Sequence, residues 1–102
     1  SQRKQDLVPD MYVLRNVEID DVTLAEVSDA IGTRLKLPIL FDHNAMARQG
    51  IEPAKFNVKM PPAQMMYSST LRRALSQARL RYQMRVDEAG KPLLWVTTVI
   101  NK

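Results

Sequence analysis

Two stretches of this chain follow the same plan, and this repeat constrains the fold more than any other feature of the sequence. "VTLAEVSDAIGTRLKLPILFD" begins at Val22, and "STLRRALSQARLRYQMRVD" begins at Ser69. Each contains Thr-Leu at a helix start, an apolar helical stripe, a leucine, a strand and an aspartate. Such a unit is too small to bury its apolar face alone. We therefore expect the two copies to pack together.

The correspondence between the copies is specific at four positions. Thr23, Leu24, Leu37 and Asp42 match Thr70, Leu71, Leu80 and Asp87. The offset falls from 47 residues at the Thr-Leu pairs to 43 at the matched leucines. We therefore expect the second helix to be one turn shorter than the first. A strand precedes each copy.

The first copy shows clear helix and strand signals. Residues 11–20 are rich in valine and predict a strand. Thr23 and Glu26 form a capping box, whose side chains satisfy free amides at a helix start. The next residues carry an apolar helical stripe with Gly32 as its weak point, and Pro38 then favours a strand at 38–42. The stripe consists of Leu24, Val27, Ile31 and Leu35.

A connection at 42–54 separates the copies. Asp42 or Asn44 can cap a single helical turn there, Gly50 can close it, and Pro53 keeps the chain from re-entering a helix. Residues 55–60 alternate between apolar and polar side chains, which predicts a strand. Residues 61–69, "PPAQMMYSS", are expected to form a loop.

The second copy predicts a helix capped by Ser69 or Thr70, with an apolar stripe that ends at Ala78. The period changes to two from Leu80, and residues 80–86 and 93–100 form a hairpin around the turn at 87–92. The expected fold is an α+β domain of two βαβ repeats and a final strand, with two helices packed against small sheets. It spans residues 11–102, and residues 1–10 are a flexible tail or linker.

Composition narrows the chemistry. The chain has no cysteine and one histidine, His43, which excludes disulfides, thiolate metal sites and cysteine nucleophiles. The carboxylate pairs Asp20–Asp21 and Asp87–Glu88 stand at element ends, where capping and turns account for them. Asp42 beside His43 is better explained by a helix cap than by a catalytic dyad. We expect no catalytic residue, metal or cofactor, and no enzyme activity.

Five arginines dominate the second half of the chain. They are Arg72, Arg73, Arg79, Arg81 and Arg85. All five fall at positions that an amphipathic helix and a half-buried strand leave polar. Residues 1–51 carry a net charge of −2 (6 Lys+Arg, 8 Asp+Glu), and residues 52–102 carry +6 (9 Lys+Arg, 3 Asp+Glu). This asymmetry can orient a partner or let copies associate head to tail.

A KH-like module that binds single-stranded nucleic acid is the alternative interpretation. Lys59, Arg81 and Arg85 could line a sheet face beside Trp95 or Tyr82, on which bases would stack. A KH module, however, needs a GXXG loop, and the three glycines of this chain stand apart.

The arrangement of motifs resembles the short N-terminal domain shared by secretins and TonB-dependent signal-transducing receptors. The resemblance covers about residues 13–100. It consists of Leu at the first helical turn, Leu-x-Leu-Pro leading into a strand, Ala-Leu in the second helix, and Leu-x-Tyr leading into the closing hairpin. Two segments are longer than in that family: the connection at 42–54 and the stretch 60–69, "MPPAQMMYSS". The 102 residues also include no barrel or secretin region.

That resemblance implies a non-enzymatic protein–protein interaction or assembly module of a larger cell-envelope protein, in the periplasm. Its implied partners are copies of itself in a ring or a regulatory envelope protein, and contact through a free strand edge is one expected mode. No apolar run approaches the roughly 20 residues that span a bilayer. The opening "SQRKQD" is typical of an excised fragment. The expected partner contacts are the five arginines above with Met65, Met66 and Tyr67.

Overall fold

The computed structural model describes residues 3–99 and shows an α+β fold with two small sheets. The elements follow the chain in the order α1 (Lys4–Leu7), η1 (a 3-10 helix, Pro9–Tyr12), β1 (Arg15–Thr23), α2 (Leu24–Leu35), β2 (Ile39–Phe41), α3 (His43–Arg48), β3 (Asn57–Met65), α4 (Tyr67–Gln77), β4 (Leu80–Val86) and β5 (Pro92–Thr98).

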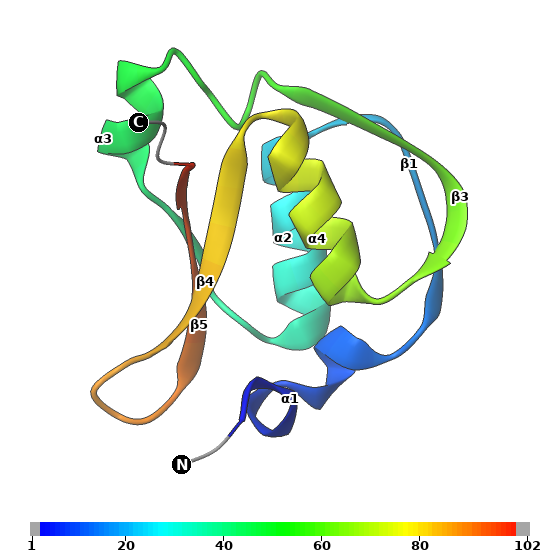
Figure 1. Ribbon diagram of the computed structural model, residues 1–102, viewed down its shortest axis with the longest axis vertical. Coiled ribbons are helices and arrows are strands. Elements are labelled where there is room, and N and C mark those ends of the chain that lie inside the picture. The colour runs from blue at the N-terminus through cyan, green and yellow to red at the C-terminus, as the bar shows by residue number, and fades with distance from the viewer. Residues whose placement is uncertain (1–2, 100–102) are drawn as a thin grey trace.

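Helices α2 and α4 lie side by side between the two sheets (Figure 1). Strands β1 and β3 form an antiparallel pair on one side. On the other side the strand order is β2-β5-β4, with β2 parallel and β4 antiparallel to β5. Each βαβ repeat therefore contributes its first strand to one sheet and its second strand to the other. The expected α+β fold, with two helices packed against small sheets, is confirmed.

The core lies where the two helices meet both sheets. Leu24 of α2 and Leu71 and Leu75 of α4 are fully buried, as are Val58 of β3 and Val96 of β5. Removal of apolar surface from water is the main driving force here, at about 25 cal/mol per Å². The helices can bury two faces at once because a sheet covers each side of the pair.

The helix ends and strand pairs of the two repeats correspond at a constant offset of 43 residues rather than at a changing one. Thr23 and Met66 are the N-caps, with φ/ψ of −73°/155° and −76°/151°. Lys36 and Arg79 both take the left-handed conformation after their helices, with φ of 53° and 57°. The second helix was expected to be shorter by one full turn, and this is wrong: α2 has 12 residues and α4 has 11.

The Thr-Leu pairs of the two copies are not structurally equivalent, because they lie one helical turn apart in the repeat. Thr23 caps α2, whereas Thr70 lies inside α4, and Met66 is the true equivalent of Thr23. Leu24 and Leu71 both reach the core although they stand one turn apart in the repeat. Positions four residues apart share a helix face, so a shift of one turn preserves the apolar pattern.

Strand pairing follows the same internal symmetry. In the β1–β3 ladder, the pair Arg15–Met65 has the symmetric equivalent Val22–Val58, and both are observed. In the other sheet, Trp95 of β5 pairs with Leu40 on one side and Gln83 on the other, and those two positions are 43 residues apart. Strand β5 has no duplicate and lies between the two copies, so it completes a sheet that the repeats alone would leave open.

The amino-terminal segment departs from the expected flexible tail. Residues Lys4–Leu7 form α1, Pro9–Tyr12 form a 3-10 helix, and Val8 and Met11 are buried in the core. The first strand consequently begins at Arg15 and not at Met11. Val8 and Met11 are one 3-10 turn apart, so both side chains face the same side of the segment and are buried together.

The expected loop at 61–69 is also wrong. Residues 61–65 extend β3, and α4 begins at Tyr67, three or four residues earlier than a cap at Ser69 or Thr70 predicts. Pro61 and Pro62 suggested a loop because proline cannot donate to a ladder, but an edge strand tolerates it. Met65 and Tyr67 are buried in the core, and Met66 between them is half-buried. The expectation that these three side chains form an exposed partner contact is therefore wrong.

Several local predictions are confirmed. The capping box of Thr23 and Glu26 is present, Asp42 caps α3, and β4 and β5 form the expected hairpin. Gly32 has a packing role, since a Cβ there would lie 2.9 Å from the backbone oxygen of Leu37. Its missing side chain allows the chain after α2 to fold back against the helix.

The left-handed residues provide a stability test of the repeat. A non-glycine residue in this conformation costs roughly 1–2 kcal/mol, which glycine avoids at a smaller cost in unfolded-state entropy. We expect Lys36→Gly and Arg79→Gly each to raise the free energy of unfolding by about 0.5–1 kcal/mol, measured by urea denaturation. Opposite signs at the two sites would contradict the structural equivalence of the two helix ends.

Candidate protein interaction groove

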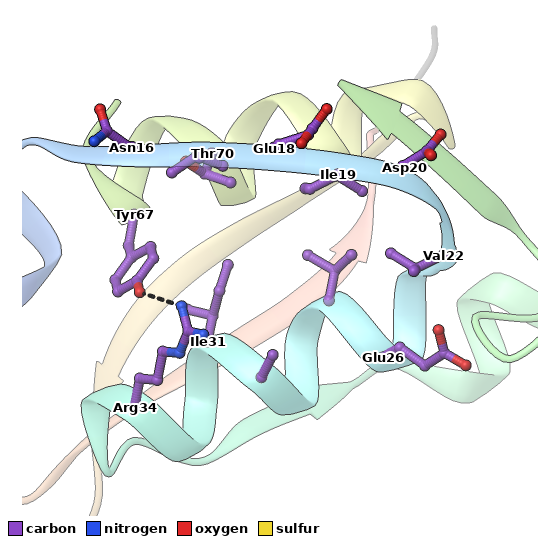
Figure 2. A pocket seen from close by; sticks show the side chains of 13 residues that line it. Asn16, Glu18, Ile19, Asp20, Val22, Glu26, Ile31, Arg34, Tyr67 and Thr70 are labelled. Atoms are coloured by element: carbon purple, nitrogen blue, oxygen red, sulfur yellow. Dashed lines mark hydrogen bonds between the residues drawn. The ribbon is translucent and has the colours of Figure 1, made fainter. Parts of the chain in front are cut away.

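A groove of about 490 Å³ lies between strand β1 and helix α2 (Figure 2). We call it the β1–α2 groove. Within residues 3–99, strand β1 pairs only with β3, so its other edge faces this groove and carries no strand partner there. The residues that line it are Asn16, Val17, Glu18, Ile19, Asp20, Val22, Glu26, Val27, Ala30, Ile31, Arg34, Tyr67 and Thr70.

The groove has an apolar floor and an acidic rim. Ile19, Val27 and Ile31 are buried at its base, and Ala30 is an exposed small residue on α2. Figure 2 shows Glu18 and Asp20 on the face of β1 that points away from α2. Because side chains alternate along a strand, Glu18 and Asp20 lie on one face of β1 and Ile19 lies on the other. The result is an apolar trough beside a row of exposed carboxylates.

Cationic groups close the opposite end of the groove. The guanidinium of Arg34 donates a hydrogen bond of 2.8 Å to the hydroxyl of Tyr67, as Figure 2 shows. The guanidinium of Arg15 stacks over the Tyr67 ring, 4.8 Å from its centroid. This contact is favourable because the ring face is electronegative. Tyr67 therefore joins the start of β1 to the end of α2.

The equivalent edge in the second repeat is sealed. The side chain of Gln77 in α4 accepts a hydrogen bond from the amide of Lys59 at 3.4 Å and donates one to its carbonyl at 3.1 Å. A partner strand would make the same two bonds. Pro61 and Pro62 follow on that edge and lack amide hydrogens. The outer edge of β3 is thus occupied by its own helix and interrupted by proline.

The β1 edge lacks this closure. At the offset of 43 residues, Arg34 stands where Gln77 stands and Asn16 where Lys59 stands. Arg34, however, binds Tyr67 and makes no hydrogen bond to the backbone of Asn16 among the bonds between described residues. At Asn16, the backbone polar groups that Gln77 covers in the second repeat are therefore available to a partner.

The arginines expected to contact a partner do not gather on one surface. Arg72, Arg73 and Arg79 are exposed around α4 and its end. Arg81 and Arg85 lie on the outer face of the β2-β5-β4 sheet, where the Arg85 guanidinium sits 5.1 Å from the Trp95 ring centroid.

The basic sheet face expected for a nucleic-acid binder is only partly assembled. Arg81, Arg85 and Trp95 share the outer face by strand alternation. Lys59 belongs to the other sheet, and the hydroxyl of Tyr82 donates to the carbonyl of Ser68 at 3.3 Å. Burial raises the pKa of Tyr82. Two of the five expected members therefore lie elsewhere.

Asp42 links α3 to the sheet. It accepts hydrogen bonds from the Ala45 amide at 3.2 Å and the Thr97 hydroxyl at 2.8 Å. The Thr97 bond, followed by the Ala45 bond, lowers the pKa of Asp42. The stabilisation is therefore present above the ordinary carboxyl pKa and is lost as the pH falls through the lowered value. His43 is exposed, with its ring 6.0 Å from that of Phe41.

Other chemistry-bearing residues have structural contacts. Ser68 and Thr70 are buried in α4, and the Thr70 hydroxyl donates to the Met66 carbonyl at 3.0 Å. Within residues 3–99, no three His, Asp or Glu side chains gather closely enough to hold a metal ion. None of the helices in that range has the length and apolar character to cross a bilayer.

Comparison with known proteins found no matching family model, no matching curated protein and no matching solved structure. The candidate site therefore depends on the geometry of this chain. The β1–α2 groove was not predicted from the sequence. The sequence does show that Val17 and Ile19 are apolar and two residues apart, which places them on one face of a strand. This pattern does not reveal that the edge of β1 stays open.

The seal on β3 has a measurable contribution. Gln77→Ala removes two side-chain bonds to Lys59, so we expect the free energy of unfolding to fall by about 1–2 kcal/mol. Hydrogen exchange of the Lys59 amide should accelerate at the same time. Arg73→Ala, an exposed change on the same helix, should stay within about 0.5 kcal/mol. Unchanged exchange at Lys59 in the Gln77 variant would argue against the seal.

The open edge can be closed by copying that seal. Arg34→Gln places a glutamine at the position equivalent to Gln77, where its amide can bond to the backbone of Asn16. We expect hydrogen exchange of the Asn16 amide to slow by about tenfold, which corresponds to roughly 1.4 kcal/mol. Arg34→Ala, which loses the same bond to Tyr67 without replacing it, is the matched control. Equal protection in both variants would rule out edge closure.

Proposed function

We propose that this chain is a non-catalytic protein–protein interaction module of a larger cell-envelope protein, and that it binds an extended partner segment along the free edge of β1. The partner segment belongs to a neighbouring copy in a ring or to a regulatory envelope protein. The single observation that supports this mode is the difference between the two repeats: the β3 edge is sealed, and the equivalent β1 edge is open.

Strand addition suits this groove physically. An edge strand offers a row of amides and carbonyls, so a partner gains main-chain hydrogen bonds whatever its side chains. Alternate side chains of the partner would point down onto α2, where Ile19, Val27 and Ile31 form an apolar surface. The helix thus supplies the selectivity that backbone pairing lacks.

The cell-envelope setting is supported by the resemblance to the short N-terminal domain of secretins and TonB-dependent receptors. The two βαβ repeats, the Leu-x-Leu-Pro stretch at 35–38 and the closing hairpin carry that resemblance. On the same basis we propose a location in the periplasm or cell envelope. Association of copies can be followed by sedimentation velocity of this chain and of longer forms of the protein, where ring assembly requires a rise in mass with concentration.

A blocked groove tests the binding mode. Ala30→Arg puts a large side chain over the floor while leaving the core untouched, because Ala30 is exposed on α2. Octapeptides selected by phage display on the wild-type chain should lose at least tenfold in affinity, about 1.4 kcal/mol, for this variant. Fluorescence anisotropy of labelled peptides provides the measurement.

Thr33→Arg is the matched control, since Thr33 is exposed on the same helix and does not line the groove. It should bind the selected peptides as the wild type does. Bound peptide should also protect β1 amides from hydrogen exchange. Selected peptides that ignore Ala30→Arg and protect a different element would refute binding at β1.

A further inference from the structure

The charges around the β1–α2 groove define the chemistry of its partner. We infer that the groove takes a cationic extended segment, in which apolar residues alternate with Lys or Arg. This inference rests on the proposed strand addition at β1. The cations would lie opposite Glu18 and Asp20, and the apolar residues would face α2.

The alternation follows from strand geometry. Glu18 and Asp20 are two residues apart and share the face of β1 that points away from α2 (Figure 2). A strand added to β1 places every second side chain on that same face, where opposite charges on neighbouring strands attract. The intervening side chains reach the floor that Val27 and Ile31 provide. A basic–apolar–basic pattern meets both requirements.

Among the side chains that the structure describes, no cation forms an ion pair with these carboxylates. The ion pairs within that part of the chain are Arg3–Asp6 and Lys55–Glu52, and neither touches the groove. Glu26 adds a third carboxylate to the same end, where one of its oxygens accepts from the Thr23 amide at 3.3 Å. An unpaired row of acids over an apolar floor raises the local concentration of a cationic segment.

The two acids occur only in the first copy of the repeat, on the strand whose edge is open. At the offset of 43 residues, Pro61 and Ala63 stand where Glu18 and Asp20 stand. The sealed edge thus carries no charge at those two positions. Pairing of β1 with β1 of a second copy would also oppose acids to acids, which disfavours a symmetric strand-to-strand dimer.

The opposite end of the groove sets a limit on the pattern. Arg34 and Arg15 flank Tyr67 there, so further cations at that end would be repelled. The inferred segment therefore carries its cations towards Glu18, Asp20 and Glu26 and is neutral or acidic near Arg34.

Synthetic peptides test this inference. The probe is a capped heptapeptide in which Lys, Val, Lys and Val are followed by Ser, Val and Ser. Two analogues replace both lysines by glutamate or by serine, and a third has the composition of the probe with its valines in one block. We expect the lysine peptide to bind at least tenfold tighter than any of the three in calorimetry at low salt. Its affinity should fall as salt rises.

Neutral variants locate the effect. Glu18→Gln with Asp20→Asn should weaken the lysine peptide about tenfold and leave the serine peptide unchanged. Asp29→Asn with Glu88→Gln removes the same net charge from exposed positions outside the groove, and should change neither. A comparable loss in this control pair would mean that net charge, and not the rim, governs binding, and would overturn the inference.

The remaining outcomes separate the two proposals. If the serine peptide binds as tightly as the lysine peptide and Ala30→Arg abolishes both, the groove stands and its cationic preference is overturned. If the block peptide equals the alternating one, simple charge attraction replaces strand addition and both proposals fail. Absence of binding by the lysine peptide at about 1 mM, a threshold near 4 kcal/mol of binding free energy, also overturns the inference.

Discussion

The packing of α2 against α4 between two sheets is the contact on which the rest of the structure depends. Neither helix could bury its apolar face in its own repeat, because the strands of that repeat go to different sheets. Leu24 and Leu71 are fully buried in one core cluster that contains residues of both copies and of strand β5. The two repeats therefore share one apolar core, as expected for units that are each too small to bury an apolar face alone.

Duplication also explains where the two halves were free to diverge. The helix ends kept one geometry, since Lys36 and Arg79 share the left-handed conformation, but the sheet edges did not. Gln77 and two prolines close the edge of β3, whereas β1 keeps its edge with two carboxylates beside it. Edge strands promote unwanted pairing unless they are protected. An open edge beside a sealed twin is therefore an informative difference, and it underlies both functional proposals.

The fold was largely predictable, and the errors have physical causes. The capping box at Thr23, the stripe of α2 and the closing hairpin were predicted because local hydrogen bonds and periodicity determine them. The extension of β3 through Pro61 was not, since only an edge position makes proline acceptable in a strand. The start of α4 was misplaced because Ser69 and Thr70 are typical N-cap residues, whereas Met66 is the N-cap and Thr70 lies one turn inside the helix, on the same apolar face.

The sequence by itself determined the two long helices, the closing hairpin, the duplication, the absence of cysteine chemistry and the charge split between the halves, because these depend on residue identity and local spacing. Only the tertiary structure decided which strands pair, which edge Gln77 covers, and that Tyr67 lies in the core rather than on a loop. Those outcomes depend on contacts between residues far apart in the chain, and local periodicity contains no information about them. The same limit hid the groove, whose acids and floor come together only when β1 crosses α2.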